Sequence, residues 1–313
     1  MVATLLIVAT ALMSVRYSRS FPEEGLRMLE RRGIPHRAII AHRGASTVAP
    51  ESTELAYARA IAMGADYLEA DLRRTIDGRI VVHHDSDLRR NSNVDEVFPD
   101  RRGESLGSFS LAELRQLDMG SWFNRDHPLR SRDQNENLPI LTLERLIEMV
   151  ERSGTSVGLV LEFKDPILYP GIEEQVMKIL ADRGWVDGSG EPIRRGSLIF
   201  FSFNLESLKR LRTAAPSVPR VFLISGEMIT WMRWRRWLRR IRGVADGIGA
   251  RGVIAWPWYI TGAHDRGLFV FPYVVNEAWQ LRLLTEYRAD GFITDRPAFL
   301  RSFVDNVITP DAP

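Results

Sequence analysis

Cysteine is absent from this chain of 313 residues, and lysine is almost absent. Without cysteine there can be no disulfide, no thiolate metal ligand and no cysteine nucleophile, so a metal centre would need oxygen or imidazole ligands. Lysine occurs only as Lys164, Lys178 and Lys209, and arginine supplies the remaining positive side chains. The net charge is only +2, although residues 233–242 alone contain six arginines. The positive charge is therefore concentrated in one segment. A nucleic-acid-binding protein would spread its basic side chains over one face of the molecule, so we expect no nucleic-acid partner.

Long apolar runs are also scarce. The one at the N-terminus, residues 2–15, is shorter than the roughly 20 residues that a membrane-spanning helix needs. No basic residue precedes it, as a signal peptide would require, and Arg16 and Arg19 follow it instead. We interpret residues 1–20 as an apolar membrane anchor or signal-like segment, with a hydrophobic helix packed on the protein as the alternative. If the segment spans, the two arginines favour a cytoplasmic position for the rest of the chain.

Apolar, β-branched segments alternate with amphipathic helical segments from residue 37 onward. Setting aside one hairpin arm, the pattern predicts eight strands, near residues 40, 69, 160, 200, 222, 249, 271 and 293. Eight alternating units over residues 37–304 predict an α/β fold, a (β/α)8 TIM barrel. In such barrels the catalytic groups lie at the C-terminal ends of the strands.

One strand candidate, residues 80–84, does not fit the alternation. Only Thr75-Ile76-Asp77-Gly78 separates it from the preceding strand, whereas a parallel crossover needs about a dozen residues or more. Asp-Gly is typical of a tight turn, so we expect residues 80–84 to form an antiparallel hairpin arm. The polar stretch that follows, about 89–137, contains one helix candidate at 111–117. We interpret it as a small inserted subdomain after the second barrel strand.

Acidic side chains mark the ends of two predicted strands. Glu69 and Asp71 are two residues apart, so both project from one face of their strand. Two carboxylates held together repel each other unless a cation lies between them, and oxygen ligands suit Mg²⁺ or Ca²⁺. Glu162 and Lys164 repeat this spacing, which makes Glu162 a candidate third ligand and Lys164 a candidate partner for phosphate oxygens. Solvated carboxylates, or a local Glu–Lys pair, are the alternatives.

Two histidines, His42 and His84, also lie at predicted strand ends. An imidazole titrates near neutral pH, so the pair could act as general acid and base. Arg43 offers a planar fork to phosphate oxygens, with a salt bridge to Glu51 or Glu69 as the alternative. Glu51 could itself be an acid at a helix N-terminus, or could orient His42 or the metal.

Several ordered motifs strengthen this interpretation. They are 42-HRG-44, 49-APEST-53, 64-GADYLEAD-71, 75-TIDGRIVVHHD-85, 138-LPILTL-143, 161-LEFK-164, 201-FSF-203 and 291-GFITDRP-297. In order and spacing, over about 260 residues, the chain resembles the glycerophosphodiester phosphodiesterase family. The resemblance implies a barrel like that of the phosphoinositide-specific phospholipases C.

The resemblance also implies roles for residues. His42 and His84 would be the acid–base pair, and one divalent cation, Mg²⁺ or Ca²⁺, would bind Glu69, Asp71 and Glu162, with Glu51 nearby. Arg43 and Lys164 would bind the phosphate.

Family members cleave a phosphodiester to glycerol phosphate and an alcohol, through attack by the substrate's own 2-hydroxyl and a cyclic phosphate. The substrate pocket would include Phe203, Tyr273 and Asn276. Ser52 replaces the family's asparagine and keeps a hydrogen-bonding group, so it changes little. Tyr273 replaces the family's tryptophan and keeps an aromatic wall with a polar tip, which leaves substrate choice open.

An arginine–tryptophan stretch, residues 228–242, follows the sixth predicted strand. Its tryptophans recur at helical spacing between arginines, a pattern typical of a helix at a membrane interface. We therefore expect this stretch to contact a membrane through Trp231, Trp234, Trp237, Arg235 and Arg239. The alternative is an outer barrel helix packed on the sheet.

Three functions remain open from the sequence. The first is metal-dependent hydrolysis of a small-molecule glycerophosphodiester. The second is cleavage of membrane lysophospholipids to lysophosphatidic acid, in the manner of a lysophospholipase D. The third is a non-catalytic membrane-binding protein on the same fold. We expect membrane association, at a bacterial inner membrane, with the cytoplasmic side favoured.

Overall fold

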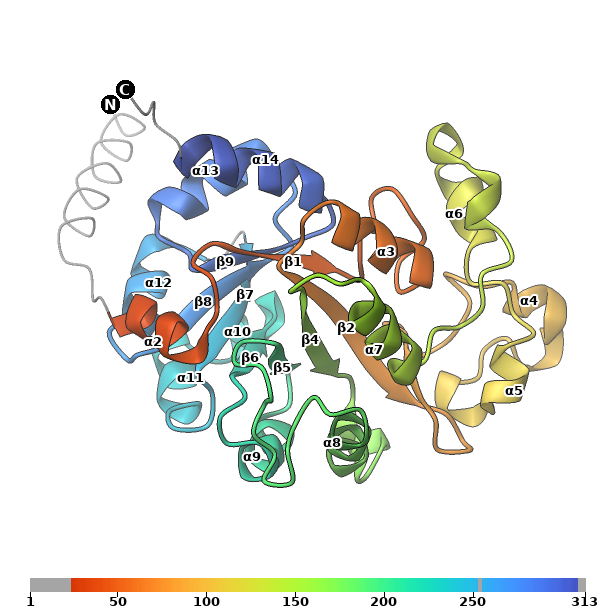
Figure 1. Ribbon diagram of the computed structural model, residues 1–313, viewed down its shortest axis with the longest axis horizontal. Coiled ribbons are helices and arrows are strands. Elements are labelled where there is room, and N and C mark those ends of the chain that lie inside the picture. Colours follow the sequence, from red (N-terminus) through yellow and green to blue (C-terminus); the bar gives the residue numbers. More distant parts are fainter. Residues whose placement is uncertain (1–23, 253–254, 309–313) are drawn as a thin grey trace.

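The computed structural model describes residues 24–252 and 255–308 and contains a barrel of eight parallel strands (Figure 1). The strands neighbour one another in the order β8-β7-β6-β5-β4-β2-β1-β9. Their bounds are β1 Ala38–His42, β2 Tyr67–Arg74, β4 Gly158–Phe163, β5 Leu198–Ser202, β6 Arg220–Ile224, β7 Gly247–Arg251, β8 Phe269–Tyr273 and β9 Gly291–Thr294. Backbone hydrogen bonds from Asp290 to Val270 and from Val275 to Ile293 link the β8 and β9 segments and nearly close the barrel. The predicted (β/α)8 barrel is confirmed.

Strand alternation separates the core into two layers. Residues at alternate positions, such as Ile40, Val160 and Phe201, fill the barrel interior, while their neighbours pack outward against the helices. The same alternation directs Glu69 and Asp71 inward above Tyr67. These acidic residues therefore lie inside the barrel because of their position on β2.

Helices surround the barrel on its outside (Figure 1). Their bounds are α3 Glu54–Ala62, α7 Leu143–Arg152, α8 Ile172–Asp182, α9 Leu205–Ala214, α10 Gly226–Trp231, α11 Trp234–Arg240, α12 Pro257–His264, α13 Ala278–Glu286 and α14 Pro297–Ile308, with the short 3-10 helix η5 Pro166–Leu168 after β4. A further helix, α2 (Glu24–Arg32), had not been predicted. Leu29 on α2 and Ile34 just after it join the interior cluster and cover the N-terminal end of the barrel.

The predicted hairpin and insertion follow β2. β3 (Ile80–Val82) pairs antiparallel with β2, which confirms the hairpin arm. Asp77 in the turn accepts hydrogen bonds from the Thr75 hydroxyl and from the Leu111 amide, so the turn is tied to the insertion. The insertion contains α4 Val94–Val97, η1 Pro99–Arg101, η2 Leu106–Ser108, α5 Leu111–Leu114, α6 Ser121–Asp126, η3 Pro128–Arg130 and η4 Asp133–Asn135. It has its own small core around Phe109 and lies at the right of Figure 1.

The arginine–tryptophan stretch differs from the expectation of one interfacial helix. It forms two short helices, α10 and α11, separated at Met232, whose backbone is extended. Trp234 is only 4% exposed, stacks on Tyr259 and donates its indole N–H to the Tyr259 carbonyl. Trp237 is half-buried against Phe222 and donates to the Met228 carbonyl. The predicted membrane contact of Trp234 is therefore wrong, because packing on the barrel buries this ring. Trp237 keeps part of its surface exposed, so its contact with a membrane stays a prediction.

The remaining members of that predicted set have separate outcomes. Arg235 and Arg239 are exposed on α11, whereas the side chain of Trp231 lies outside what the structure describes. The predicted apolar segment 1–20 also lies outside the described residues. Within the described ranges, no helix is both long enough and apolar enough to cross a membrane.

Candidate active site

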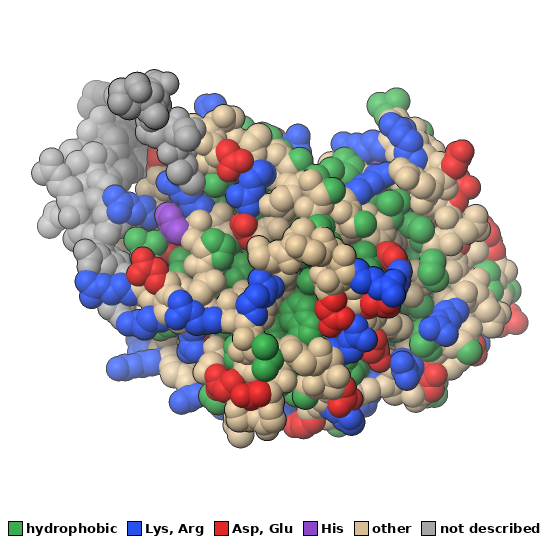
Figure 2. Space-filling model, viewed as in Figure 1, with side chains coloured by type: hydrophobic (Ala, Val, Ile, Leu, Met, Phe, Trp, Pro, Cys, Tyr) green, Lys and Arg blue, Asp and Glu red, His purple; other side chains and the backbone are tan. Residues whose placement is uncertain are grey.

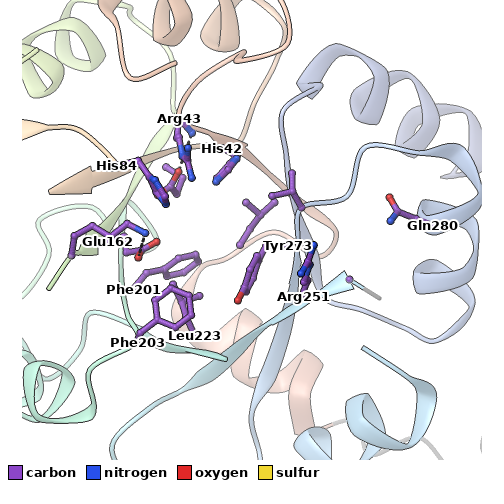
Figure 3. A pocket seen from close by; sticks show the side chains of 15 residues that line it. His42, Arg43, His84, Glu162, Phe201, Phe203, Leu223, Arg251, Tyr273 and Gln280 are labelled. Carbon is purple, nitrogen blue, oxygen red and sulfur yellow. Dashed lines mark hydrogen bonds and ion pairs between the residues drawn. The ribbon is translucent and has the colours of Figure 1, made fainter. Parts of the chain in front are cut away.

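A cavity of about 370 Å³ lies at the C-terminal ends of the barrel strands. One wall contains His42, Arg43, His84 and Glu162 (Figure 3), and Lys164 also lines the cavity. The catalytic, metal and phosphate-binding candidates were predicted from separate strand ends. The structure brings them together at one end of the barrel, where such sites are found.

Each candidate catalytic histidine is held by an aspartate through its Nδ1 atom. His42, at the end of β1, places Nδ1 2.7 Å from Oδ1 of Asp295, which follows β9. His84, just beyond β3, places Nδ1 2.5 Å from Oδ1 of Asp85. With Nδ1 bonded in this way, Nε2 of each ring is the nitrogen left for proton transfer.

The aspartates are themselves held in place. Asp295 accepts hydrogen bonds from the Ser46 hydroxyl at 3.0 Å and from the Asn276 side-chain amide at 2.6 Å. Although burial raises its pKa, contact with His42 lowers the pKa of Asp295 to about 2. Asp85 accepts a hydrogen bond from Arg90 at 2.6 Å. Although burial raises its pKa, His84 and Arg90 hold the pKa of Asp85 well below the usual range. Both carboxylates are therefore charged at neutral pH.

Three buried carboxylates lie beside the histidines. Glu69, Asp71 and Glu162 each offer an oxygen atom, and these atoms all lie within 4.8 Å of one another. Parallel registers that pair His42 with Glu69, and Asp71 with Glu162, produce this arrangement. The predicted triad is therefore assembled by the neighbouring strands β2 and β4, and β1, on the other side of β2, places His42 beside Glu69.

The triad has unsatisfied capacity for a cation. Glu69 Oε1 is buried and accepts no hydrogen bond from the described residues, whereas Asp71 Oδ2 and Glu162 Oε1, also buried, face Arg43 and Lys164 as ion pairs. Burial, followed by the charges of Asp71 and Glu162, raises the pKa of Glu69. Burial opposes ionisation of Asp71 too, but Lys164 and Arg43 hold its pKa well below the usual range. A hard divalent cation that prefers oxygen ligands fits this donor set.

Two cations flank the triad. Lys164 Nζ lies 2.6 Å from Glu162 Oε1 and 3.2 Å from Asp71 Oδ1. Arg43 Nε lies 3.2 Å from Asp71 Oδ2, and its Nη1 lies 2.9 Å from Glu51. The salt bridge to Glu51 that was weighed for Arg43 is thus present. Both cations nevertheless line the cavity and can also face an anionic substrate.

Glu51 and the left-handed backbone at Arg43 fix the loop after β1. Glu51 joins Arg43 to Arg90, which in turn holds Asp85. Arg43 has φ near 55°, and its backbone N–H donates to Glu69 Oε2 at 2.9 Å. Glu51 therefore positions the arginines, whereas the sequence had left open a role toward His42 or the metal.

The predicted pocket residues divide into two groups. Phe203 and Tyr273 line the cavity with their rings edge to face, and Lys164 lies 5.6 Å from the Phe203 ring centre. Asn276 does not line it, which corrects the prediction. Its amide donates to Asp295 and its oxygen accepts from the Thr294 hydroxyl and the Asp295 amide, so both ends are used to position Asp295.

Comparisons with known proteins show which family the chain belongs to. The model of the glycerophosphoryl diester phosphodiesterase family matches residues 42–299. The chain belongs to that family. It is 32% identical over 258 residues to a glycerophosphodiester phosphodiesterase of Bacillus subtilis, covering 82% of this chain and 83% of the relative. The predicted resemblance and enzyme class, a phosphoric diester hydrolase, are confirmed.

Solved structures of this family agree with the fold. A phosphodiesterase from Oleispira antarctica, in complex with the product sn-glycerol 3-phosphate, superposes with a TM-score of 0.68 at 25% identity, covering 86% of this chain and 97% of that one. A glycerophosphodiester phosphodiesterase from Agrobacterium tumefaciens superposes with a TM-score of 0.63 at 24% identity, covering 85% and 99%.

Three site residues of this family member escaped the sequence analysis. Asp295 and Asp85 lie within the quoted motifs 291–297 and 75–85 but received no role, although an aspartate directly after His84 was a usable signal. Arg251, at the end of β7, lines the far wall of the cavity beside Tyr273 (Figure 3). Among the described residues, Arg251 makes no ion pair with a carboxylate, and no local pattern marked it.

Proposed function

We propose that the chain hydrolyses a glycerophosphodiester to sn-glycerol 3-phosphate and an alcohol, using one divalent cation and two histidines. The observation that carries this proposal is the position of His42 and His84, both anchored through Nδ1, on the same cavity as the carboxylate triad. The names of the Bacillus subtilis relative and the product bound by the Oleispira antarctica enzyme support it. Intact catalytic and acidic residues argue against a non-catalytic membrane-binding protein.

The residues can divide the work as follows. Glu69, Asp71 and Glu162 would hold Mg²⁺ or Ca²⁺, which when bound supplies positive charge for the phosphate oxygens. Arg43 and Lys164 supply fixed positive charge on the same side of the cavity. One histidine Nε2 accepts the proton of the substrate's 2-hydroxyl, while the other histidine donates a proton to the leaving alcohol.

The proposed reaction has two steps. First, the 2-hydroxyl oxygen bonds to phosphorus and the bond to the leaving alcohol breaks, which gives a cyclic glycerol phosphate and the free alcohol. Then water adds to phosphorus and the bond to the 2-oxygen breaks, with the two histidines exchanging roles. The products are glycerol 3-phosphate and an alcohol, and both histidines regain their starting protonation states.

A second candidate substrate is a lysophospholipid. A groove of about 830 Å³ adjoins the active site and shares His84, Glu162, Lys164 and Phe203 with it. Ile167, 76% exposed, and Leu168, 64% exposed, line this groove. Exposed apolar side chains beside a reaction centre favour a substrate whose glycerol carries an acyl chain, as in cleavage of a lysophospholipid to lysophosphatidic acid.

We also propose that the chain works at a membrane surface, at the bacterial inner membrane and with the cytoplasmic side favoured. With Trp234 buried on the barrel, support comes from the apolar residues 2–15 and from exposed Arg235 and Arg239 on α11. Arginines near a membrane attract anionic lipids. Sedimentation of the full chain with anionic and with neutral vesicles tests this: we expect greater recovery with anionic vesicles, and no recovery with either kind would contradict the proposal.

The activity is tested with glycerophosphocholine and lysophosphatidylcholine, each with Mg²⁺, with Ca²⁺ and with chelator. We expect metal-dependent release of choline, lost in His42→Ala and retained in His36→Ala, a control whose exposed side chain lies at the opposite end of β1. The preferred substrate distinguishes the two candidates. No turnover of either substrate with any ion would contradict the proposal.

A further inference from the structure

A second cavity, of about 390 Å³, lies at the N-terminal end of the barrel, away from the active site. It is bordered by the first residue of β6 and by the segments that lead into β7 and β8. Five arginines line it: Arg32, Arg212, Arg220, Arg242 and Arg266. Figure 2 shows Lys and Arg side chains gathered on the adjoining side of the molecule, over α2 and α11. We call this cavity the arginine cavity.

A single carboxylate, Asp246, lines the arginine cavity, and its oxygens are already used. Oδ1 accepts from Arg32 at 2.6 Å, and Oδ2 accepts from the side chain of Arg220 at 2.7 Å and from its backbone at 3.0 Å. Arg220 is 4% exposed, and its side chain also donates to four backbone carbonyls. Arg32, Arg220 and Asp246 are therefore held in place by one another and form a rigid part of the cavity wall.

The other three arginines lack a carboxylate partner within the described part of the chain. Arg212 donates to the Gly243 carbonyl and Arg266 to the Gly262 carbonyl at 2.7 Å. Arg242 is exposed at the cavity rim. Five cations thus face one carboxylate, and four positive charges remain uncompensated by side chains of the cavity wall.

Helix dipoles offset only part of this excess. The C-terminal ends of α9, α11 and α12 border the cavity, and each carries a partial negative charge of about 0.5. Together they balance less than half of the surplus. Burial lowers the pKa of Arg220, and the charges of Arg32 and Arg212 lower it further, as expected where cations crowd one another.

We infer that the arginine cavity binds a phosphomonoester group carrying two negative charges. Guanidinium forks match phosphate oxygens in bidentate geometry, and Arg242 and Arg266 have donors to spare at the rim. The volume suits a phosphate with a small attached group. Apolar Met28, Leu238 and Leu268 in the wall can contact that attached group. The group could come from a soluble phosphate ester or from a phosphatidic acid headgroup.

The test uses the full chain and the double variant R242Q/R266Q, with R102Q/R115Q as a matched control of exposed arginines of the insertion, outside the cavity. Inorganic phosphate and glycerol 3-phosphate are titrated by calorimetry, and binding to phosphatidylcholine vesicles with and without phosphatidic acid is measured by sedimentation. The active site is unchanged in both variants, so a difference in phosphate binding between them belongs to the arginine cavity.

We expect R242Q/R266Q to weaken binding of at least one phosphate probe by roughly tenfold or more, as for loss of charge-assisted hydrogen bonds, while R102Q/R115Q leaves it unchanged. Binding of the soluble probes would identify a soluble ester as the source, and binding only of phosphatidic acid vesicles would identify the headgroup. Unchanged activity on glycerophosphocholine shows that the variants are folded. Equal binding by the parent chain and R242Q/R266Q, or no binding of any probe, would overturn the inference.

Discussion

His42 and Asp295 are 253 positions apart in sequence, yet His42 Nδ1 lies 2.7 Å from Asp295 Oδ1. β1 and β9 are neighbours in the barrel, and these residues lie at and just beyond their C-terminal ends. The contact turns His42 so that Nε2 faces the cavity side, and it keeps Nδ1 from taking part in proton transfer.

Replacing Asp295 therefore tests the orientation of His42. In Asp295→Asn we expect kcat on glycerophosphocholine to fall by roughly 10²-fold with KM little changed, because the variant loses proton transfer rather than substrate binding. Ser46→Ala, which removes a hydrogen bond to the same carboxylate oxygen, should have a much smaller effect. Steady-state kinetics of the three proteins measure this. A rise in KM at constant kcat would assign Asp295 to substrate binding instead.

Glu69→Gln tests whether the carboxylate triad binds a cation, because the variant removes a negative charge that is destabilising without metal and stabilising with it. Burial and the neighbouring carboxylates raise the pKa of Glu69 in the folded chain, so its charged form destabilises the fold at neutral pH when no cation is bound. The amide keeps an oxygen that can accept from the Arg43 backbone. In chelator we expect a higher Tm for Glu69→Gln than for the parent chain. With Mg²⁺ or Ca²⁺ the Tm of the parent should rise and that of the variant should rise less.

Glu148→Gln, on the outer helix α7, is the matched control and should respond to metal like the parent. Two results together would show that the carboxylate triad is not a cation site. In chelator, the Tm of the parent chain would be equal to or higher than that of Glu69→Gln, and neither Mg²⁺ nor Ca²⁺ would change the Tm of the parent chain.

His83 makes stability depend on pH. Its ring is buried, Nε2 lies 3.0 Å from the Asp87 carbonyl, and burial lowers its pKa from 6.5 to about 4. Between these values the unfolded chain binds a proton that the folded chain does not, so the free energy of unfolding falls as pH drops, by about 3 kcal/mol in total. His83→Gln keeps an N–H donor without titrating. Urea unfolding from pH 7 to 4 should show a smaller decrease for this variant, and an equal decrease would be inconsistent with a neutral buried His83.

Arg251 is expected to influence the choice of leaving alcohol. It lies across the cavity from the phosphate-binding residues and has no carboxylate partner in the described part of the chain. Arg251→Gln should reduce kcat/KM for glycerophosphoserine about tenfold more than for glycerophosphocholine, because only the former offers a carboxylate to the guanidinium. Arg152→Gln, exposed on α7, is the control. The same loss for both substrates would exclude a role in discrimination.

Local sequence patterns were enough to predict much of the site. Glu69 and Asp71 could be placed together because strand periodicity is local, and β4 supplied Glu162 at the matching strand end. Asp295 could not be paired with His42 in the same way, because their contact depends on β9 returning beside β1. Arg251 likewise reaches the cavity only through closure of the barrel.

The arginine–tryptophan stretch shows where local pattern misleads. A basic helix with regularly spaced tryptophans looks the same whether its apolar side meets lipid or protein. The structure distinguishes these, since Trp234 stacks on Tyr259 of α12 and Trp237 packs on Phe222 of β6. Helix α2 was missed because its contribution, Leu29 at the end of the barrel, depends on a partner surface formed much later in the sequence.

The most direct test of two-histidine catalysis compares leaving groups. His42→Ala and His84→Ala are each assayed on glycerophosphocholine and on a glycerol phosphodiester whose leaving alcohol is p-nitrophenol, which departs without needing a proton. We predict that one variant, lacking the general acid, regains much of its rate with p-nitrophenol, while the other, lacking the general base, stays slow with both substrates. Equal losses on both substrates for both variants would contradict the division of acid and base roles between His42 and His84.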